Sequence, residues 1–313
     1  MKHRVLVTGG FGFLGGRISQ ELAKLPNSEI VLTSRKSRQS PSWLPNCKTI
    51  QLDVCDDLSI SNAVKGVDTI VHLASLNDQD SKVDLQKTFD VTTLGTMRLV
   101  DAAINSGVSK FVYQSSVHIY GRNLVGQVTE QTIPAPENIY AISHLAAEQY
   151  LAAMVIKGKI SGAILRCANG FGTPTHKDVN AWHLLVNGLC QEALQYKVLK
   201  LRSSGMQRRD FITIADIARA FSHILTLENA DSPSPIYNLG SSISTPVIEM
   251  ANLIADLVGK TTGSKPKIEV PMIKSSDQEL SSEIDVSKLR STGFMPVNDY
   301  GTEILNILKL LQS

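Results

Sequence analysis

The chain has 313 residues, of which 42% are hydrophobic and 19% are charged, so its composition is that of a globular protein rather than a disordered or fibrous one. Its 31 basic and 29 acidic residues leave a formal charge of +2, which provides neither a basic face for nucleic acid nor an acidic tail. No apolar run reaches the ~20 residues of a membrane helix, and the four cysteines are too scattered for a disulfide scaffold. We therefore expect a cytoplasmic protein with no nucleic-acid or membrane partner and, at ~150 residues per domain, two domains.

Short runs rich in Val, Ile and Leu alternate with helical stretches through the first 170 residues. Such runs are typical of parallel strands that are covered on both faces. The predicted strands are residues 4–8, 29–33, 49–52, 69–73, 110–114 and 162–166. The predicted helices between them are residues 13–24, 58–65, 84–106 and 138–157. This alternation predicts an α/β fold with a doubly wound parallel sheet.

The regularity weakens after about residue 170. Residues 259–282 are rich in Thr, Ser, Lys and Pro and indicate an exposed connection around one short strand. Helices are predicted at residues 180–196, 215–228, 246–258 and 299–312. We therefore expect a sheet domain over residues 1–170 and a smaller mixed α/β lobe over residues 171–313, from which some strands or helices return to the first domain. The ligand should lie in the crevice of this architecture.

A glycine-rich turn follows the first predicted strand. Gly9, Gly12 and Gly15 stand three residues apart, immediately before the first predicted helix. Glycine lets the backbone turn sharply and approach a pyrophosphate, whose charge then lies at a helix N-terminus. This placement predicts a dinucleotide site that includes Phe13 and Leu14, although a tight turn without a ligand would have the same glycines.

The segment Thr8–Gly15, T-G-G-F-G-F-L-G, resembles the opening of the extended short-chain dehydrogenases/reductases of the nucleotide-sugar epimerase/dehydratase type. Segments similar to further motifs of this family follow in the family's order along almost the whole chain. They are Asp53 after the third predicted strand, His72-Leu73-Ala74-Ser75, Gly95-Thr96, Ser115–Gly121, Arg166–Asn169, Arg209-Asp210-Phe211 and Tyr237–Gly240.

This resemblance implies a Rossmann-type sheet, an NAD(P) cofactor and a nucleotide-sugar substrate. It also implies a homodimer in which the helices near residues 84–106 and 138–157 pair with a second copy. The positions that match the family's remaining cofactor contacts are Asp53, Val54, Leu73 and Ala74.

The residues after the second predicted strand bear on the choice of cofactor. An enzyme that uses NAD usually has a carboxylate there, which accepts hydrogen bonds from the ribose 2′-hydroxyl. This chain has Arg35, Lys36 and Arg38 instead. Because arginine pairs well with a phosphate, the sequence favours NADP over NAD, with a solvated basic loop as the alternative.

Three residues are the predicted catalytic set. In the family that the chain resembles, a serine polarises the reacting oxygen, and a tyrosine four residues before a lysine moves the proton. Ser116 and Tyr140 match these positions, whereas His144 stands where the lysine is expected and Thr92 where an asparagine is expected. Tyr140 and His144, at i and i+4, should share a helix face, so an ordinary surface pair is the alternative.

The histidine changes the expected proton chemistry. An uncharged His144 stabilises a tyrosinate much less than a lysine does, so Tyr140 should donate a proton more readily than it removes one. The sequence therefore favours the reduction of a keto-sugar by NADPH. A 4-epimerase with tightly bound NAD and a cofactor-binding protein with a degenerate site remain open. Dehydration is disfavoured, because Ser116-Val117-His118 lacks the acidic pair of the related 4,6-dehydratases.

On the substrate side, Asn169 and Arg209 resemble positions that hold the diphosphate of a sugar nucleotide, a task that suits arginine. The adjacent Arg208 could take the same role, and either arginine could instead pair with Asp210 or Asp216.

His118 is a further candidate for the sugar side of the site. The other histidines lack metal-ligand spacing, and no metal is predicted.

Overall fold

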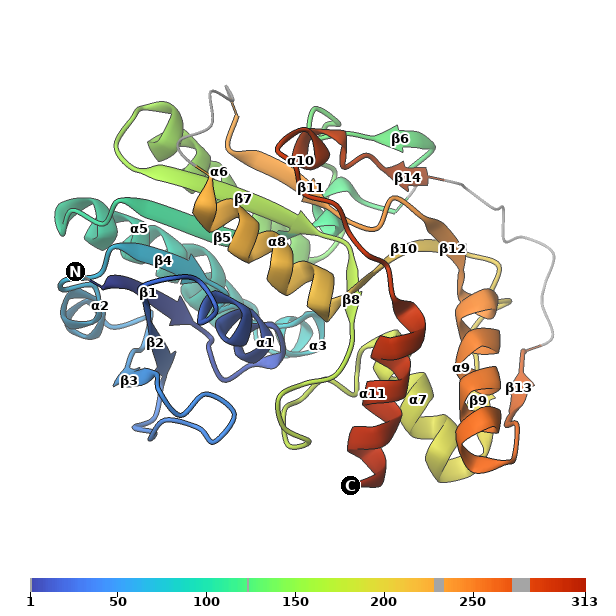
Figure 1. The fold of residues 1–313 in the computed structure, drawn as a ribbon. Coiled ribbons are helices and arrows are strands. Elements are labelled where there is room, and N and C mark those ends of the chain that lie inside the picture. The colour runs from blue at the N-terminus through green and yellow to red at the C-terminus, as the bar shows by residue number, and fades with distance from the viewer. Residues whose placement is uncertain (1, 123, 228–233, 272–281) are drawn as a thin grey trace. The chain divides into compact units, whose positions relative to one another are not determined.

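A computed structural model describes residues 2–122, 124–227, 234–271 and 282–313 of the chain (Figure 1). Its contacts divide the chain into two compact units. Unit 1 comprises residues 1–122, 132–167 and 218–238, and unit 2 comprises residues 123–131, 168–217 and 239–313. The chain passes between the units five times, whereas the sequence predicts a boundary near residue 170, with some later strands or helices returning to the first domain. The interpretation of residues 1–170 and 171–313 as two domains stays a prediction.

Unit 1 contains a seven-stranded sheet in the order β11-β7-β5-β4-β1-β2-β3. The pairs from β7 to β3 are all parallel. The strands are β1 (His3–Thr8), β2 (Ser28–Ser34), β3 (Lys48–Gln51), β4 (Thr69–His72), β5 (Lys110–Ser116), β7 (Ser161–Cys167) and β11 (Ile236–Leu239). The predicted α/β class and its doubly wound parallel sheet are confirmed. The inner strands are buried as expected, whereas the edge strand β3 is only half-buried or exposed along its length.

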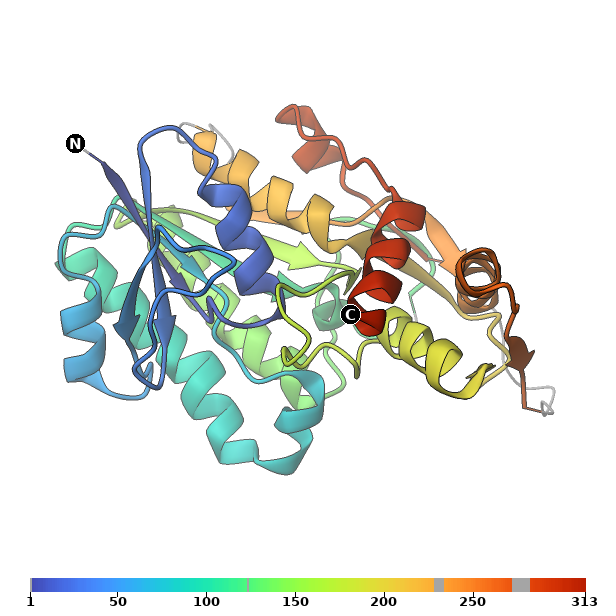
Figure 2. The same cartoon turned by 60° about the horizontal axis from the view of Figure 1, so that its bottom comes forward.

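Helices cover both faces of this sheet. Figures 1 and 2 show α1 and α8 on one face and α5 and α6 on the other. The helices are α1 (Phe13–Leu22), α2 (Asp57–Ala63), α3 (Asp78–Val83), α4 (Leu85–Thr88), α5 (Gly95–Asn105), α6 (Ile139–Ile156) and α8 (Ile214–Thr226), with a π-helix η1 (Phe89–Leu94) and a 3-10 helix η2 (Val117–Tyr120). The predicted helix 84–106 is thus present as α4, η1 and α5, with a π-helical segment that nothing in the sequence indicated.

Helix α6 is, within the described residues, the one helix that is long and apolar enough to cross a membrane by length and composition. The expectation that no segment reaches this length missed it, because its polar residues are spread among Ala, Ile and Leu. In unit 1 the helix packs against β5 and β7 and buries His144 and Glu148, as a core helix does.

Unit 2 has a three-stranded sheet and two strand pairs. The sheet is β8 (Asn169–Phe171), β10 (Arg208–Thr213) and β12 (Ser244–Pro246). The pairs are β9 (Val198–Lys200) with β13 (Lys267–Glu269) and β6 (Gly126–Val128) with β14 (Ser282–Ile284). β13 is the short strand expected within residues 259–282, of which residues 272–281 lie outside the described part of the chain.

The core of unit 2 lies among three of its helices. The helices of this unit are α7 (Leu185–Tyr196), α9 (Val247–Thr262), α10 (Ser287–Ser291) and α11 (Tyr300–Gln312). The apolar faces of α7, α9 and α11 meet around Phe171 and Phe211 of the sheet. The predicted tail helix is therefore present, with Ile304 and Leu308 fully buried.

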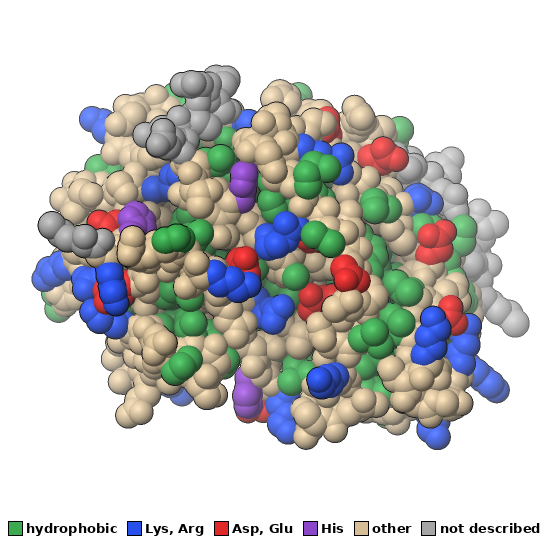
Figure 3. Space-filling view, viewed as in Figure 1, with side chains coloured by type: hydrophobic (Ala, Val, Ile, Leu, Met, Phe, Trp, Pro, Cys, Tyr) green, Lys and Arg blue, Asp and Glu red, His purple; other side chains and the backbone are tan. Residues whose placement is uncertain are grey.

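The surface has no region of one charge sign on the face drawn in Figure 3, where basic and acidic side chains are interspersed. This distribution agrees with the near-neutral charge of the whole sequence.

Candidate active site

The glycine turn joins β1 to α1 within unit 1. Gly9 has a φ of +66°, and its carbonyl accepts a hydrogen bond from the amide of Gly12 at 2.8 Å. Helix α1 lies so close to the turn that a Cβ added at Gly15 would overlap the carbonyl oxygen of Gly9 and come within 2.7 Å of Gly10 Cα. Glycine is therefore required at position 15 by backbone packing, and at position 9 by the left-handed conformation.

The N-terminus of α1 provides unpaired amides beside this turn. Gly12 is the N-cap residue and contributes no side-chain cap. The first-turn amides of Phe13, Leu14 and Gly15 have no carbonyl partner one turn earlier in the helix, so they remain available to an anion. Close backbone approach and a helix N-terminus together fit the pyrophosphate of a dinucleotide.

The turn after β4 is held against the turn after β1. The hydroxyl oxygen of Thr8 accepts hydrogen bonds from the amides of Leu73 at 3.0 Å and Ala74 at 3.2 Å. A Cβ added at Gly9 would lie 3.1 Å from the carbonyl of Leu73. The structure thus brings the predicted cofactor residues Gly9, Leu73 and Ala74 together at the carboxyl ends of the neighbouring strands β1 and β4.

Of the basic residues after β2, Arg38 lies against the glycine turn between β1 and α1. Arg35, Lys36 and Arg38 are exposed. The guanidinium of Arg38 lies 4.9 Å from the centre of the Phe11 ring, which also meets Trp43 edge-on at 6.1 Å. This stack holds Arg38 beside the glycine turn, which the loop composition alone did not indicate.

Asp53 and Val54 lie after β3, where they shape the turn into α2. The Asp53 carboxylate accepts a hydrogen bond from the amide of Cys55 at 2.9 Å, and the amide of Asp53 donates to Ser59. Val54 is buried against Gly95, where an added Cβ would come within 2.8 Å of the valine side chain. Asp53 therefore holds the turn by a hydrogen bond and Val54 packs against α5, whether or not either residue also contacts a cofactor.

The predicted catalytic serine and tyrosine lie together in unit 1. Ser116 ends β5, and its hydroxyl oxygen caps η2 by accepting from the amide of His118 at 3.2 Å. Tyr140 is in the first turn of α6, which Asn138 caps. Burial of the phenol raises the pKa of Tyr140 to about 12, although hydrogen bonds to Ser116 and Gln114 act in the opposite direction. Tyr140 is therefore protonated at neutral pH.

His144 lies one turn after Tyr140, and their ring centres are 4.5 Å apart. Its Nδ1 is 2.7 Å from the hydroxyl of Tyr113 on β5. Burial lowers the pKa of His144 to about 3, so the imidazole is neutral. Its Nε2 is buried and has no hydrogen-bond partner among the residues that the structure describes.

A second buried histidine belongs to the same layer of side chains. His72 Nδ1 lies 2.6 Å from the hydroxyl of Thr8, and its Nε2 lies 2.9 Å from the hydroxyl of Thr96. The hydroxyl of Thr96 donates to the carbonyl of Thr92, within the π-helical segment. This donation leaves Thr96 to accept from His72 Nε2–H, which assigns the neutral Nε2–H tautomer to His72. Burial lowers the pKa of His72 to about 3.

Sequence reasoning missed Tyr113 as the partner of His144. The available signal was the period of two along β5, which places Tyr113 on the same face as Phe111. That face packs against α5 and α6, so a polar aromatic residue there needs a buried partner.

The substrate-side candidates fall in different units. His118 is exposed in unit 1, and its ring lies edge-on to that of Tyr140 with ring centres 6.2 Å apart, so this predicted substrate-side residue lies beside the predicted catalytic tyrosine. Asn169 and Arg209 belong to the three-stranded sheet of unit 2, where Asn169 donates to the carbonyl of Asp210 at 3.0 Å. Arg209 is exposed on β10.

The sequence leaves open that Arg208 or Arg209 pairs with Asp210 or Asp216, and both carboxylates accept hydrogen bonds from backbone amides. Asp210 accepts from the amide of Ser241 at 2.7 Å and from the amide of Ser242 at 3.0 Å. Asp216 accepts from two backbone amides of the segment before α11. Arg208 donates to Ser244. Backbone donors thus occupy much of the capacity of both carboxylates.

Across the described parts of the chain, no three histidine, cysteine, aspartate or glutamate side chains are grouped so that they could hold a metal ion.

Comparisons with known proteins agree with this geometry. The profile of the NAD dependent epimerase/dehydratase family matches residues 5–240. The dTDP-D-glucose 4,6-dehydratase of Mus musculus is 29% identical over 309 residues, which cover 94% of this chain and 84% of that protein. A putative UDP-glucose 4-epimerase of Methanocaldococcus jannaschii is 24% identical over 315 residues, covering 99% and 98%.

Solved structures of the same fold are also similar. MoeE5 in complex with UDP-glucuronic acid and NAD has a TM-score of 0.81 and 25% identity, over 99% of each chain.

Proposed function

Because the chain belongs to the NAD-dependent epimerase/dehydratase family, we propose that it is an enzyme that transfers a hydride at a ring carbon of a nucleotide-diphosphate sugar. The glycine turn, the uncapped α1 and the Ser116–Tyr140 pair support this function. A structural relative carries a UDP-sugar and NAD together, which supports the same pair of ligands here.

The residues of the site favour reduction of a keto-sugar over oxidation of an alcohol. When bound, the reduced dinucleotide supplies the hydride and is itself oxidised. Ser116 hydrogen-bonds the carbonyl oxygen, and Tyr140 transfers its phenolic proton to that oxygen as the alcohol forms. The feature that supports this direction is position 144, where the ring centre of a buried histidine lies 4.5 Å from that of Tyr140 and burial lowers the histidine pKa to about 3. Among the described residues, no cation lowers the pKa of Tyr140.

The decisive assay measures reduced-cofactor absorbance with a nucleotide keto-sugar. We expect loss of that absorbance in the wild type and none in Tyr140→Phe, which keeps the ring and loses the proton. Inversion at a hydroxyl-bearing ring carbon of the sugar, without net change in absorbance, would support instead the 4-epimerase with tightly bound NAD. A relative that is a putative UDP-glucose 4-epimerase favours this alternative. Ligand binding that is unaffected by Tyr140→Phe, with no turnover, would indicate a degenerate site.

We propose NADP as the preferred cofactor. Arg35, Lys36 and Arg38 follow β2 without a carboxylate, and the stack on Phe11 directs Arg38 to the edge of the turn. A 2′-phosphate would pair with these cations. Titration with both reduced nucleotides tests this: tighter binding of NADPH is expected, and equal or tighter binding of NADH would refute it.

The substrate side is proposed to include Asn169, Arg209 and His118. Arginine suits a diphosphate through charge-assisted hydrogen bonds. Arg209→Ala should therefore raise the KM for the nucleotide sugar while the Kd of the dinucleotide stays unchanged. A changed dinucleotide Kd alone would contradict this assignment.

We further propose a cytoplasmic homodimer that pairs the outer faces of η1 and α6. Leu94 and Ile142 are 39% and 40% exposed on these elements, so both could bury apolar surface against a second copy. Light scattering should give twice the monomer mass, and Ile142→Glu should reduce it to the monomer mass.

A further inference from the structure

A buried ion pair joins α6 to the sheet in unit 1. The guanidinium of Arg166 on β7 is 1% exposed, and Glu148 on α6 is fully buried. Arg166 Nε lies 3.2 Å from Oε1 and 3.1 Å from Oε2 of the Glu148 carboxylate, and Nη2 also donates to Oε1. These contacts make the pair a charge-assisted fork rather than a single long-range attraction.

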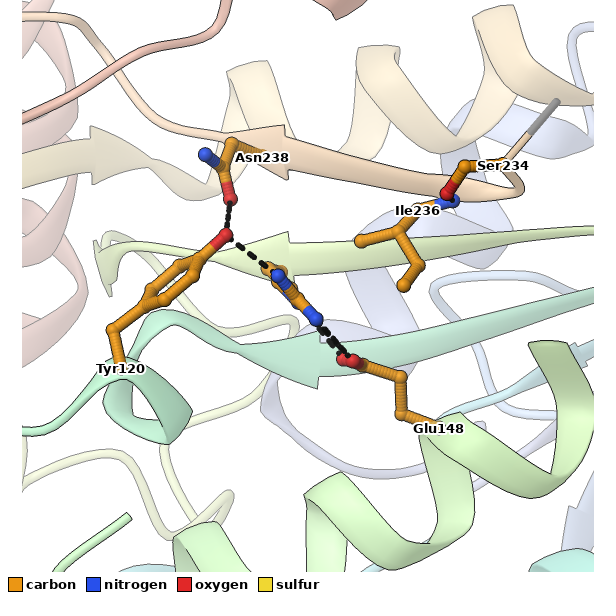
Figure 4. Close-up of polar contacts among 6 residues, drawn as sticks. Tyr120, Glu148, Ser234, Ile236 and Asn238 are labelled. Atoms are coloured by element: carbon orange, nitrogen blue, oxygen red, sulfur yellow. Dashed lines mark hydrogen bonds and ion pairs between the residues drawn. The ribbon is translucent and has the colours of Figure 1, made fainter. Parts of the chain in front are cut away.

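The same guanidinium also binds a second element. Arg166 Nη1 donates to the hydroxyl of Tyr120 at 2.7 Å, and that hydroxyl donates to the side-chain oxygen of Asn238 at 2.7 Å. The guanidinium carbon also lies 4.9 Å from the centre of the Tyr120 ring. Figure 4 shows Tyr120, Glu148 and Asn238 converging from a turn, a helix and a strand.

Each end of this network lies on an element that carries a reacting group. Tyr140, His144 and Glu148 are spaced at i, i+4 and i+8, so they follow one face of α6. Tyr120 is the last residue of η2, the turn that Ser116 caps. One cation therefore contacts both the helix that carries the proton donor and the turn that follows the serine.

We propose that Glu148 and Tyr120, acting through Arg166, are positioning residues that set the distance between Ser116 and Tyr140. The proposal rests on the proposed function, in which that pair acts on the substrate oxygen. A buried ion pair is weak support for stability as such, because desolvation offsets much of the attraction. A role in geometry accounts for why this pair extends to the turn after Ser116.

The kinetic test uses Tyr120→Phe and Glu148→Gln, with Tyr150→Phe as the matched control. Tyr150 also lies on α6 and donates to Asp101 at 2.5 Å, on the side of the helix away from the network. Tyr120→Phe removes only the hydroxyl that links Arg166 to Asn238. Glu148→Gln keeps the shape and removes the charge.

In single-turnover hydride transfer, each network variant should lose about tenfold to a hundredfold in rate, since small misplacements of reacting groups have costs of this size. The pH profile should shift, the dinucleotide Kd should stay within about twofold, and the control should match the wild type. A Tyr120→Phe variant with the wild-type rate and pH profile would overturn the proposal, whether or not Glu148→Gln folds.

A measurement without turnover separates this proposal from the proposed function. Fluorotyrosine incorporated at the seven tyrosines gives ¹⁹F NMR signals, and the signal of Tyr140 is identified by its loss in Tyr140→Phe. The Tyr140 signal should move in Tyr120→Phe and stay in place in Tyr150→Phe. If the wild type transfers no hydride, the proposed function fails and this signal still decides. An unmoved Tyr140 signal in a folded Tyr120→Phe variant rejects the positioning role.

Discussion

The residue at position 144 lies next to Tyr140, where a histidine is neutral and a lysine would be a cation. His144 is held by Tyr113 at 2.7 Å and is kept neutral by burial, so Tyr140 retains its proton. In the proposed function, this single side chain would bias hydride transfer toward reduction of the ketone.

We predict that His144→Lys shifts the alkaline limb of the pH–rate profile downward and speeds alcohol oxidation more than ketone reduction. A cation about 5 Å from the phenol at an effective dielectric of about 20 stabilises tyrosinate by about 3 kcal/mol, or about two pKa units. The profiles are measured in both directions by cofactor absorbance. His144→Gln is the neutral control, and coincident profiles for lysine, glutamine and wild type would contradict the electrostatic account.

Gly15 has no side chain, and this lets α1 pack directly against the backbone of Gly9. We predict that Gly15→Ala weakens dinucleotide binding by about fivefold to 150-fold, because displacing the overlapping Gly9 backbone costs about 1–3 kcal/mol. Fluorescence titration of the reduced cofactor measures the Kd. Gly301→Ala is the control, since the nearest atom to its added Cβ is 3.9 Å away, and an equal effect there would argue against a local cause.

Polar side chains connect helices to neighbouring elements through hydrogen bonds that helix propensity does not predict. Thr93 of η1 donates to the carbonyl of Ser143 in α6 at 3.0 Å, which links the π-helical segment to the helix that carries Tyr140 and His144. π-helical turns often occur at functional sites. Here the turn contains Thr92, one of the two departures from the family pattern.

Lys110 links the start of β5 to the end of α8, so its substitution tests how much a polar side chain stabilises a helix end. Its ammonium group, in the first residue of β5, donates to the carbonyls of Ile224 at 3.1 Å and Leu227 at 2.5 Å, at the end of α8. Lys110→Met should lower the free energy of unfolding by about 1–3 kcal/mol, because partly buried carbonyls at the end of α8 lose a charged donor.

Urea unfolding measures this loss. Lys65→Met removes a surface contact with Asn62 and should change the free energy of unfolding by less than about 0.5 kcal/mol. A Lys110→Met loss as small as that of the control would show that water replaces the lysine.

For the whole molecule, the two buried histidines make stability depend on pH. In the folded chain the pKa values of His72 and His144 lie near 3, whereas an unfolded histidine titrates near 6.5. Between these values the unfolded state binds more protons, so stability falls as the pH drops below about 6.5. Asp210 acts in the opposite direction, because burial raises its folded pKa to about 6.

We therefore predict that His144→Gln flattens the loss of stability under acid. At pH 5.5 one such histidine accounts for about 1.4 kcal/mol of the loss relative to high pH. The difference in unfolding free energy between pH 7.5 and pH 5.5 should shrink by about this amount in the variant. Comparing the two proteins cancels Asp210, and an unchanged difference would show that His144 is protonated in the folded state.

The strands and the glycine turn could be predicted from sequence because their causes are local. Dense β-branched runs bury on both faces, and the turn needs glycine at fixed spacing. The pairing of Tyr113 with His144 and of His72 with Thr96 could not be predicted, since each joins elements far apart in the chain. The helix predicted from residue 180 begins instead at Leu185, because residues 181–184 form a turn that the apolar pattern does not distinguish from a helix.

The five chain crossings between the units bear on how this enzyme could be re-engineered. Tyr120, Arg166 and Asn238 all belong to unit 1 and stand within two residues of the crossings that follow residues 122, 167 and 238. A chimera that takes unit 2 from a relative should therefore be spliced after these residues, so that the network is inherited whole from one parent. Junctions placed a few residues earlier would combine half-networks from two proteins, and a buried arginine would lose its partners.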